Sequence, residues 1–409
     1  MIRRVAVTGI GAISAFGHTY QDLWAGLAAG KSAIRPLTLV APGAVRFPNA
    51  AEVPEYDSLG YFEEKEASLL DRFAQFAAVA AREAVRASGI EFSPELGERT
   101  AIVLGCSGGG KSTEDDGFHH LYALQEPRVS PLTIARAMSN AGASRVSLEY
   151  GITGPVFTIS TACSSANHSI GQAFRMVRAG EVEVAIAGGS EAPLSMGFLK
   201  AWEAMRVVSP DTCRPFSRDR RGLILGEGAA VLILEPVERA RARGARIWGE
   251  IAGFGMSSDA HHITQPSALG AARAMRAALS DAKLGAAELA PEAIGYINAH
   301  GTGTLANDAT ETEAIRSVFG EHSRKLLVSS TKSMHGHALG AAGALEAAAT
   351  LGALQAGLIP PTANFTEPDP ACDLDVVPNT ARLAQIEWAI SNSFAFGGLN
   401  AVLIFRKSI

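Results

Sequence analysis

Residues 159–164 read Ile-Ser-Thr-Ala-Cys-Ser, and they indicate the fold class most directly because an apolar strand is followed at once by a helix. The strand is predicted at Val156–Ser160. The helix is indicated by apolar residues at helical spacing, with a glycine as a suitable C-terminal stop: Ile170, Ala173, Phe174, Val177 and then Gly180. Residues 329–333, Ser-Ser-Thr-Lys-Ser, repeat the strand-to-helix pattern. The repeat predicts two similar α/β halves.

Short apolar runs alternate with alanine-rich helical patterns along the whole chain, which predicts an α/β fold with largely buried strands. Further predicted strands are Arg4–Thr8, Thr100–Leu104, Val182–Ala187, Ala229–Glu235, Ala293–Ala299, Lys325–Ser329 and Leu399–Arg406. A second similarity joins residues 5–14 to residues 295–304, where each strand ends in a predicted Gly-x-Gly turn. No Pro/Ser-rich linker divides the chain. We expect halves 1–250 and 251–409 packed into one integrated domain.

Composition excludes several classes of protein. The chain has 409 residues, of which 47% are apolar and 19% charged, with a formal net charge of −5. Disorder requires lower hydrophobicity and higher net charge. The 36 Lys and Arg residues are fewer than the 41 Asp and Glu residues, which argues against a nucleic-acid partner. The apolar stretch 337–359 contains Glu346 and many alanines and glycines, so we expect a buried core helix and no membrane span.

The four cysteines form no Cys-x-x-Cys pair, so neither a zinc site nor a disulfide framework is predicted. His335 and His337 resemble a metal pair, but no third ligand is evident, and we expect no metal. The simplest interpretation of the cysteines is as small buried side chains in a reducing, cytoplasmic setting.

A phosphate-binding loop has to be considered at Gly105–Ser112, which fits the pattern G-x-x-x-x-G-K-[ST] after a predicted strand. Three carboxylates follow at residues 114–116, beside the phosphates such a loop would hold. No apolar strand ending in Asp supplies a magnesium ligand. A glycine-rich turn is therefore the favoured interpretation, and a nucleotide-binding protein is kept as an alternative.

Three residues are candidates for the chemistry. Cys163 lies at the N-terminus of a predicted buried helix, where the helix dipole is expected to lower the thiol pKa and make a better nucleophile. The sharp strand–Cys–helix turn follows the logic of a nucleophile elbow. His300 and His337 each follow the carboxyl end of a buried strand, the edge at which α/β sheets bind ligands.

Together these motifs resemble the elongating β-ketoacyl-acyl-carrier-protein synthases of the thiolase-like superfamily. The resemblance spans nearly the whole chain and rests on TACSSA (161–166), NAHGTGT (298–304), STKSMHGHALGAAGALE (330–346) and NSFAFGGLN (392–400), in order and at family-like spacing. It implies a five-layered αβαβα domain of two similar halves, usually a dimer. The first half would carry the nucleophile and the second both histidines.

The resemblance also implies a mechanism. Cys163 would hold an acyl group as a thioester, and malonyl-acyl carrier protein would lose CO₂ and condense with it to give a 3-oxoacyl-acyl carrier protein. His300 and His337 would serve decarboxylation, supported by Lys332 paired with Glu346. The backbone N–H groups of Cys163 and Phe396 match the oxyanion hole of the family. The residues that match its substrate and pantetheine contacts are Thr302, Thr304, Phe394 and Phe396, and Phe396 also matches its gate residue. No resident cofactor is implied, because phosphopantetheine arrives with the carrier protein.

Departures from the family pattern point to a specialised enzyme of a fatty-acid, type II polyketide or polyene pathway. The segment after residue 60 is mostly acidic and apolar where relatives offer basic residues to the carrier protein, and Glu203 replaces a basic residue. Segment 110–116 falls where the family lines its acyl pocket near the dimer interface. We expect a homodimer or a heterodimer with a chain-length-factor-like subunit. The chain could itself be such a non-catalytic partner, or a degradative thiolase, but its Cys-His-His set argues against both.

Overall fold

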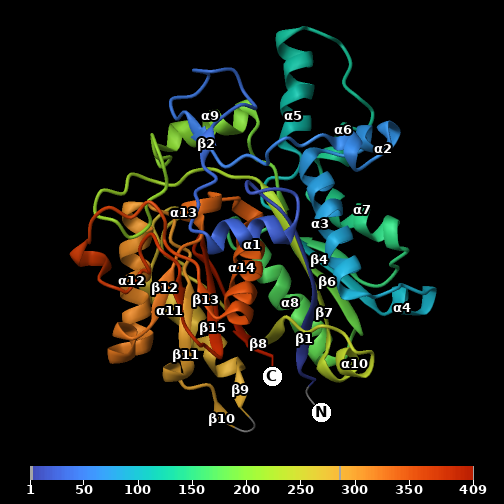
Figure 1. Ribbon diagram of the computed structural model, residues 1–409. Coiled ribbons are helices and arrows are strands. Elements are labelled where there is room, and N and C mark those ends of the chain that lie inside the picture. Colours follow the sequence, from blue (N-terminus) through green and yellow to red (C-terminus); the bar gives the residue numbers. More distant parts are fainter. Residues whose placement is uncertain (1–2, 285–286, 409) are drawn as a thin grey trace.

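The computed structural model describes residues 3–284 and 287–408, and its centre is one ten-stranded mixed sheet (Figure 1). The strand order is β12-β11-β15-β16-β8-β1-β7-β6-β4-β5. Strands β1 (Val5–Ile13) and β8 (Gly249–Ser258) meet in the middle through a short antiparallel ladder of three residue pairs. Five strands lie on each side of this join.

The two sides have the same topology. The first half contains β1, β4 (Thr100–Gly105), β5 (Val156–Ile159), β6 (Val184–Glu191) and β7 (Gly228–Pro236). The second half contains β8, β11 (Ile294–Asn298), β12 (Leu327–Ser329), β15 (Trp388–Ala395) and β16 (Leu399–Arg406). If the strands of each half are ranked along the chain, both halves have the order first, fifth, fourth, second, third. The parallel and antiparallel pairings also agree, so the predicted similarity of the halves is confirmed.

Helices form three layers around the sheet. α8 (Ser165–Ala179) and α14 (Ala342–Ala356) lie in the middle, and each contacts strands of both halves. α3 (Arg72–Ser88) and α7 (Ala141–Tyr150) cover the outer face of the first half, and α11 (Ala268–Asp281) and α12 (Leu305–Phe319) that of the second (Figure 1). The arrangement is the predicted αβαβα fold. α14 is buried along nearly its whole length, as expected for a core helix.

The remaining elements are short and connect these layers. The helices are α1 (Tyr20–Ala28), α2 (Glu64–Ser68), α4 (Pro94–Glu98), α5 (Lys111–Phe118), α6 (Thr133–Ala137), α9 (Met196–Met205), α10 (Val237–Ala242) and α13 (Lys332–His335). Two-residue strands form the pairs β2 (Arg35–Pro36) with β3 (Asn49–Ala50), β9 (Lys283–Leu284) with β10 (Ala287–Glu288), and β13 (Leu358–Ile359) with β14 (Arg382–Leu383). In the part of the chain described, no helix is long and apolar enough to span a bilayer.

The predicted turn at Gly9 and Gly11 is wrong, because β1 continues through both glycines to Ile13. A Cβ at either position would overlap backbone of α3, so the glycines let the helix approach the strand. Gly253 and Gly255 do the same in β8 against α11. The counterpart of β1 is therefore β8 and not the strand near residue 295, which corresponds to β4. Strands β8 and β15 were not among those predicted.

Candidate active site

Cys163 occupies a sharp turn between β5 and α8. The preceding residue, Ala162, has a φ of +49°, a strained conformation for a side chain with a Cβ. Ser164 is the N-cap residue of α8, and Gly180 ends this helix in the left-handed conformation. The predicted strand–Cys–helix geometry is confirmed, including the buried face formed by Ile170, Ala173, Phe174 and Val177.

The expected lowering of the Cys163 pKa is wrong. Burial removes the thiolate from water and raises the pKa of Cys163 to about 12, and the carboxylates of Glu191 and Glu346 act in the same direction. The charge of Lys332 lowers this pKa without reversing the shift. The resting thiol is therefore protonated at neutral pH, and its proton must leave during reaction.

A cavity of about 120 Å³ brings the candidate residues together from both halves of the chain. Its lining includes the predicted nucleophile, both histidines and the predicted substrate contacts: Cys163, His300, His337, Thr302, Thr304, Phe394 and Phe396. The rings of His300 and His337 are 5.5 Å apart, nearly perpendicular. Lys332 and Glu346 do not line the cavity.

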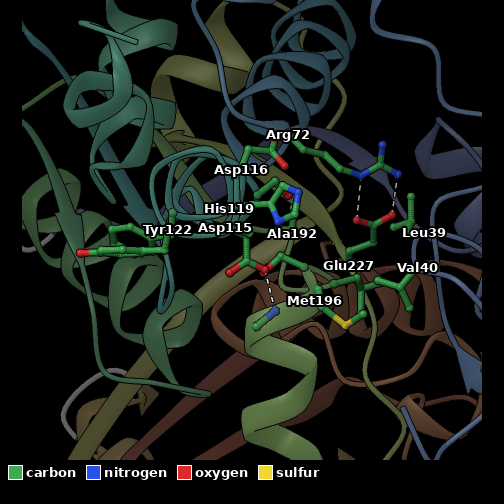
Figure 2. A pocket seen from close by; sticks show the side chains of 16 residues that line it. Leu39, Val40, Arg72, Asp115, Asp116, His119, Tyr122, Ala192, Met196 and Glu227 are labelled. Carbon is green, nitrogen blue, oxygen red and sulfur yellow. Dashed lines mark hydrogen bonds and ion pairs between the residues drawn. The ribbon is translucent and has the colours of Figure 1, made fainter. Parts of the chain in front are cut away.

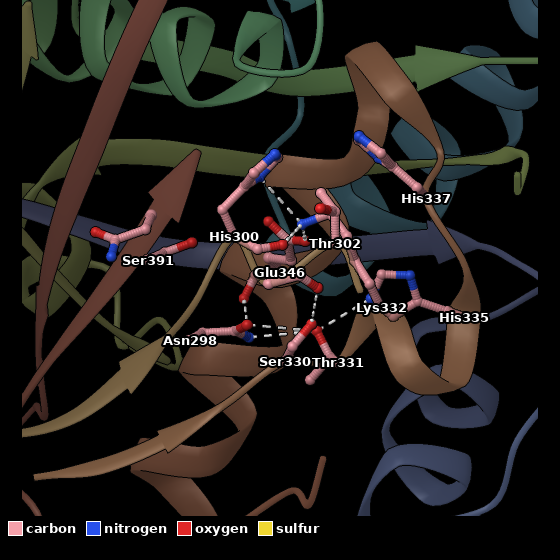
Figure 3. A network of polar contacts seen from close by, with 12 residues as sticks. Asn298, His300, Thr302, Ser330, Thr331, Lys332, His335, His337, Glu346 and Ser391 are labelled. Atoms are coloured by element: carbon pink, nitrogen blue, oxygen red, sulfur yellow. Dashed lines mark hydrogen bonds and ion pairs between the residues drawn. The ribbon is translucent and has the colours of Figure 1, made fainter. Parts of the chain in front are cut away.

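Lys332 contacts His300 from outside the cavity (Figure 3). It is fully buried, forms an ion pair with Glu346, and donates to the carbonyl oxygen of His300 at 2.7 Å. Its Nζ also lies 3.3 Å from Nδ1 of His300. An ammonium group can only donate, so Nδ1 accepts and the proton of a neutral His300 ring is on Nε2. Burial raises the pKa of Glu346 to about 7, although Lys332 opposes this shift.

A backbone hydrogen bond fixes the same tautomer of His337. The N–H of Leu339 donates to its Nδ1 at 3.2 Å, which leaves the ring proton on Nε2. Burial is the largest cause that holds the pKa of both His300 and His337 well below the ordinary value, and the charge of Lys332 adds to it. Both rings are therefore neutral hydrogen-bond donors.

Phe394 and Phe396 stand at the end of β15, on the cavity wall. Phe396 stacks on Trp202 of α9, with ring centroids 6.2 Å apart, and Phe394 packs edge-on against His300 at 6.0 Å. The hydroxyl groups of Thr302 and Thr304 are hydrogen-bonded to each other at 2.9 Å. These positions are compatible with the gate and pantetheine roles that the resemblance implies, and those roles remain predictions.

Three buried carboxylates of the site were missed in the sequence. Glu311 accepts from the backbone N–H groups of His300 and Gly301, at 2.9 and 2.8 Å. Asp308, one turn earlier on α12, accepts from Phe216 and Gly303. Acidic residues at spacing i, i+3 in the first turns of a helix beside the His300 motif were the available signal. Glu191, at the end of β6, is the third.

Glu191 also explains the phosphate-loop pattern at Gly105–Ser112. Its carboxylate accepts from the backbone N–H groups of Ser107 and Gly108, at 2.7 and 2.9 Å. Lys111 pairs with Glu114 of its own helix. A carboxylate of the chain thus occupies loop N–H groups that a phosphate would need, which argues against the nucleotide alternative.

A second cavity, of about 550 Å³, is lined by residues of α5 and by the segment before α9 (Figure 2). Arg72 and Glu227 form a double hydrogen bond on one wall, and Asp115 accepts from the N–H of Gly197. Leu194 lines this cavity and also belongs to the apolar cluster that contains Cys163. Ser112, Asp115 and Asp116 of the segment 110–116 therefore line a cavity. That this cavity takes the acyl chain, as the resemblance implied, stays a prediction.

In the described part of the chain, all four cysteines are free and buried, and no group of three or more His, Cys, Asp or Glu side chains is arranged to hold a metal ion. His119, His120, His261 and His262 are exposed.

Comparison with known proteins agrees with the fold and the motifs. Residues 2–240 match the Beta-ketoacyl synthase N-terminal domain and residues 248–366 its C-terminal domain. The chain is 46% identical to Nodulation protein E of Rhizobium sp. (strain N33), with 100% of both chains covered. It is 41% identical to 3-oxoacyl-[acyl-carrier-protein] synthase 2 of Synechocystis sp., covering 99% of this chain and 98% of the relative.

Two solved structures extend the comparison over their full length. The ishigamide ketosynthase/chain length factor has a TM-score of 0.94 at 39% identity, with 100% of both chains covered. A type II polyketide ketosynthase solved in complex with its acyl-carrier protein and bound to the hexaketide has a TM-score of 0.90 at 29% identity, again with full coverage of both. With both family domains matched in order, the chain belongs to the β-ketoacyl synthase family.

Proposed function

We propose that Cys163, His300 and His337 carry out the elongating condensation that β-ketoacyl synthases catalyse. In the first stage the sulfur of Cys163 attacks the acyl thioester of an acyl carrier protein. The acyl–sulfur bond to pantetheine breaks, the pantetheine thiol leaves with the proton of Cys163, and the acyl group stays on the enzyme as a thioester.

In the second stage malonyl-acyl carrier protein enters, and the bond to its terminal carboxylate breaks to release CO₂. The electron pair forms an enolate whose oxygen accepts hydrogen bonds from the Nε2–H groups of His300 and His337. The enolate carbon then attacks the acyl carbonyl, whose developing charge faces the N–H groups of Cys163 and Phe396. The bond from the acyl carbon to Cys163 breaks, the product, a 3-oxoacyl-acyl carrier protein, forms, and Cys163 departs as a thiolate that regains its proton from water.

The observation that carries this proposal is the shared cavity of Cys163 and two neutral histidines with their protons on Nε2. Neutral donors stabilise an enolate without needing to gain or lose a proton first. A chain-length-factor-like partner does not need a nucleophile at a strained elbow, so the non-catalytic alternative is not favoured. No resident cofactor takes part in these steps.

Labelling the protein with cerulenin, or with a short acyl-acyl carrier protein, tests the assignment. We expect a single adduct on Cys163, located by peptide mass spectrometry, and loss of condensation in Cys163→Ala. An adduct on Cys106 or Cys213, or retained condensation in Cys163→Ala, would show the assignment to be wrong.

The carrier protein is proposed to dock at the mouth of the Cys163 cavity, beside α9. Glu203, the acidic substitution noted in the sequence, forms an ion pair with Lys200 at 3.2 Å and accepts a hydrogen bond from the backbone N–H of Arg46. Arg206 is exposed, ends α9 in a left-handed conformation and directly precedes Val207, which lines the cavity. A carrier protein, which the related ketosynthase binds in its solved complex, would place an acidic side chain on this arginine while its pantetheine arm enters the cavity.

A second copy of the chain, or a related subunit, is proposed to pair along β5. β5 is at the end of the sheet, where no other strand of the described chain lies beside it, and Phe157 on it is 38% exposed. The opposite end is protected, because Val328 of β12 donates to the carbonyl oxygen of Asp375. Exposed apolar side chains also occur in the segment 118–148 that precedes β5: Phe118, Tyr122, Ile134 and Leu148. An unpaired, apolar edge favours strand addition.

The acyl chain is proposed to pass Leu194 into the second cavity. The lining of this cavity is largely apolar but includes the Arg72–Glu227 pair and Asp115, polar groups that a pocket for a plain saturated chain does not need. Identity to Nodulation protein E relatives, 44–46%, exceeds identity to the 3-oxoacyl-[acyl-carrier-protein] synthase 2 relatives compared, 38–41%. Both support a specialised enzyme. Full efficiency with ordinary saturated chains on housekeeping carrier protein would contradict it.

A further inference from the structure

Glu191 joins two loops that belong to different halves of the chain. It ends β6, is fully buried, and accepts from Ser107 and Gly108 on the loop after β4. The hydroxyl of Ser107 also donates to it, at 2.6 Å. On the other side it accepts from the N–H of Gly340 at 3.0 Å. The thiol of Cys106 also donates to it, at 3.5 Å. Together these five donors occupy the acceptor sites of one carboxylate.

The loop at Gly340 is the turn that sets the tautomer of His337. Leu339, the residue whose N–H donates to Nδ1 of His337, has a φ of +44°. A leucine in this region of backbone space is strained, and such residues persist only when neighbouring contacts hold them. The next N–H along the chain is the one that Glu191 accepts.

The contact between the two loops is close. A Cβ on Gly340 would be 2.5 Å from the backbone nitrogen of Ser107 and would overlap the carboxylate of Glu191. A small shift of either loop would therefore be transmitted to Leu339 and to the hydrogen bond that His337 accepts.

We propose that Glu191 is a positioning residue for decarboxylation, which holds the strained turn at Leu339 so that His337 presents its Nε2–H to the enolate oxygen. This inference rests on the proposed role of His337. Glu191 does not touch the substrate. Glu191 acts on His337 through Gly340 and Leu339. Its hydrogen bonds to the loop at Ser107 fix the position of the Glu191 carboxylate.

The position of Glu191 predicts a division between the two stages of the reaction. Acyl transfer to Cys163 does not need the Nε2–H of His337, whereas decarboxylation does. The negative charge of Glu191 also raises the pKa of the Cys163 thiol, so removal of this charge favours thiol reactivity. A loss of Glu191 should therefore slow decarboxylation while leaving acylation intact or faster.

The experiment compares Glu191→Gln, Glu191→Asp and the wild-type enzyme in two assays. One measures CO₂ release from malonyl-acyl carrier protein, and the other measures acylation of Cys163 by acyl-acyl carrier protein. We expect Glu191→Gln to lower CO₂ release by about tenfold or more, with acylation within about threefold of wild type. Glu191→Asp keeps the charge but cannot span both loops, so it should lower CO₂ release similarly.

Glu235→Gln is the matched control. Glu235, on β7, is another fully buried carboxylate. It accepts a hydrogen bond from Thr8, forms an ion pair with Arg243, and lines neither cavity. It should change thermal stability without changing the ratio of the two rates. A further variant, Leu339→Gly, removes the backbone strain, and the effect of Glu191→Gln on CO₂ release should be smaller in that background.

Equal losses in both assays, or CO₂ release within twofold of wild type in folded Glu191→Gln, would overturn the inference. If Glu191→Gln does not fold, Glu191→Asp decides by the same criteria. A wild-type enzyme that neither acylates Cys163 nor releases CO₂ would instead count against the proposed function.

Discussion

The buried ammonium of Lys332 donates to the backbone carbonyl of His300 at 2.7 Å and lies 3.3 Å from Nδ1 of the same histidine. One side chain thus holds both the main chain and the ring of His300, and the third donor of the ammonium goes to Glu346. The tautomer of His300 follows from this contact. Lys332, which fixes the tautomer of His300, therefore lies outside the cavity that His300 lines.

Lys332→Met should therefore reduce CO₂ release from malonyl-acyl carrier protein by about a hundredfold, because the Nδ1 of His300 loses the donor that fixes its tautomer. It also leaves Glu346 buried without its cation, which should lower the free energy of unfolding by about 3–5 kcal/mol. The double variant Lys332→Met with Glu346→Gln should recover stability but not activity. Recovery of both would contradict the role given to Lys332. Kinetics and chemical denaturation provide the two measurements.

The raised pKa of Cys163 predicts how the thiol reacts with iodoacetamide. Between pH 7 and 9 the thiolate fraction, and with it the alkylation rate, should rise about tenfold per pH unit, because the whole range lies below the thiol pKa of about 12. Cys163→Ser provides the background from the other cysteines. A rate that reaches a plateau below pH 8 would show that the helix dipole, as the sequence suggested, dominates over burial.

Four buried histidines make the fold sensitive to acid. Burial lowers the pKa of His335 to about 3, and it lowers the pKa of His168, His300 and His337 as well. Below pH 6.5 these histidines bind protons in the unfolded chain but not in the folded chain, so the free energy of unfolding decreases as pH falls. The free energy of unfolding should fall by up to about 1.4 kcal/mol per pH unit for each histidine. In His335→Gln this slope should be shallower between pH 6.5 and 4; an unchanged slope would argue against the shift.

Phe157→Asp should weaken assembly, because it places a charge on the apolar edge strand β5 through which a second copy is proposed to pair. Light scattering after size-exclusion chromatography should show a dimer for wild type and a monomer, or a concentration-dependent mixture, for the variant. Leu383→Asp changes an exposed apolar residue elsewhere, on β14, and should leave the dimer intact. A wild-type monomer would contradict the proposal. Co-purification with a related chain would identify a heterodimer.

Arg206→Glu should raise the KM for acyl-acyl carrier protein by about tenfold while leaving kcat nearly unchanged, because it reverses the charge at the proposed docking surface. With a short acyl thioester of N-acetylcysteamine, which has no carrier protein, KM should stay the same. Arg382→Glu reverses an exposed charge on β14 and serves as the control. An equal rise of KM with both substrates would place Arg206 in the pantetheine site instead.

The sequence by itself predicted the elements whose signal is local. The strand–Cys–helix turn at Cys163, the core helix after His337 and the repetition of strand-to-helix segments all follow from apolar periodicity and a few turn residues. The family resemblance added the partnership of Cys163 with His300 and His337, which lie more than a hundred residues away. The same residues line one cavity in the structure.

Only the tertiary structure decided properties that depend on what surrounds a residue. Gly9 and Gly11 read as a turn, but the approach of α3 makes them part of a strand. Gly105–Ser112 reads as a phosphate loop, but Glu191, about 80 residues later, occupies its N–H groups. Cys163 has the local setting of an activated thiol, yet burial raises its pKa. Hydrogen-bond partners and desolvation are set by packing between distant segments, whereas periodicity and turn chemistry are written in consecutive residues.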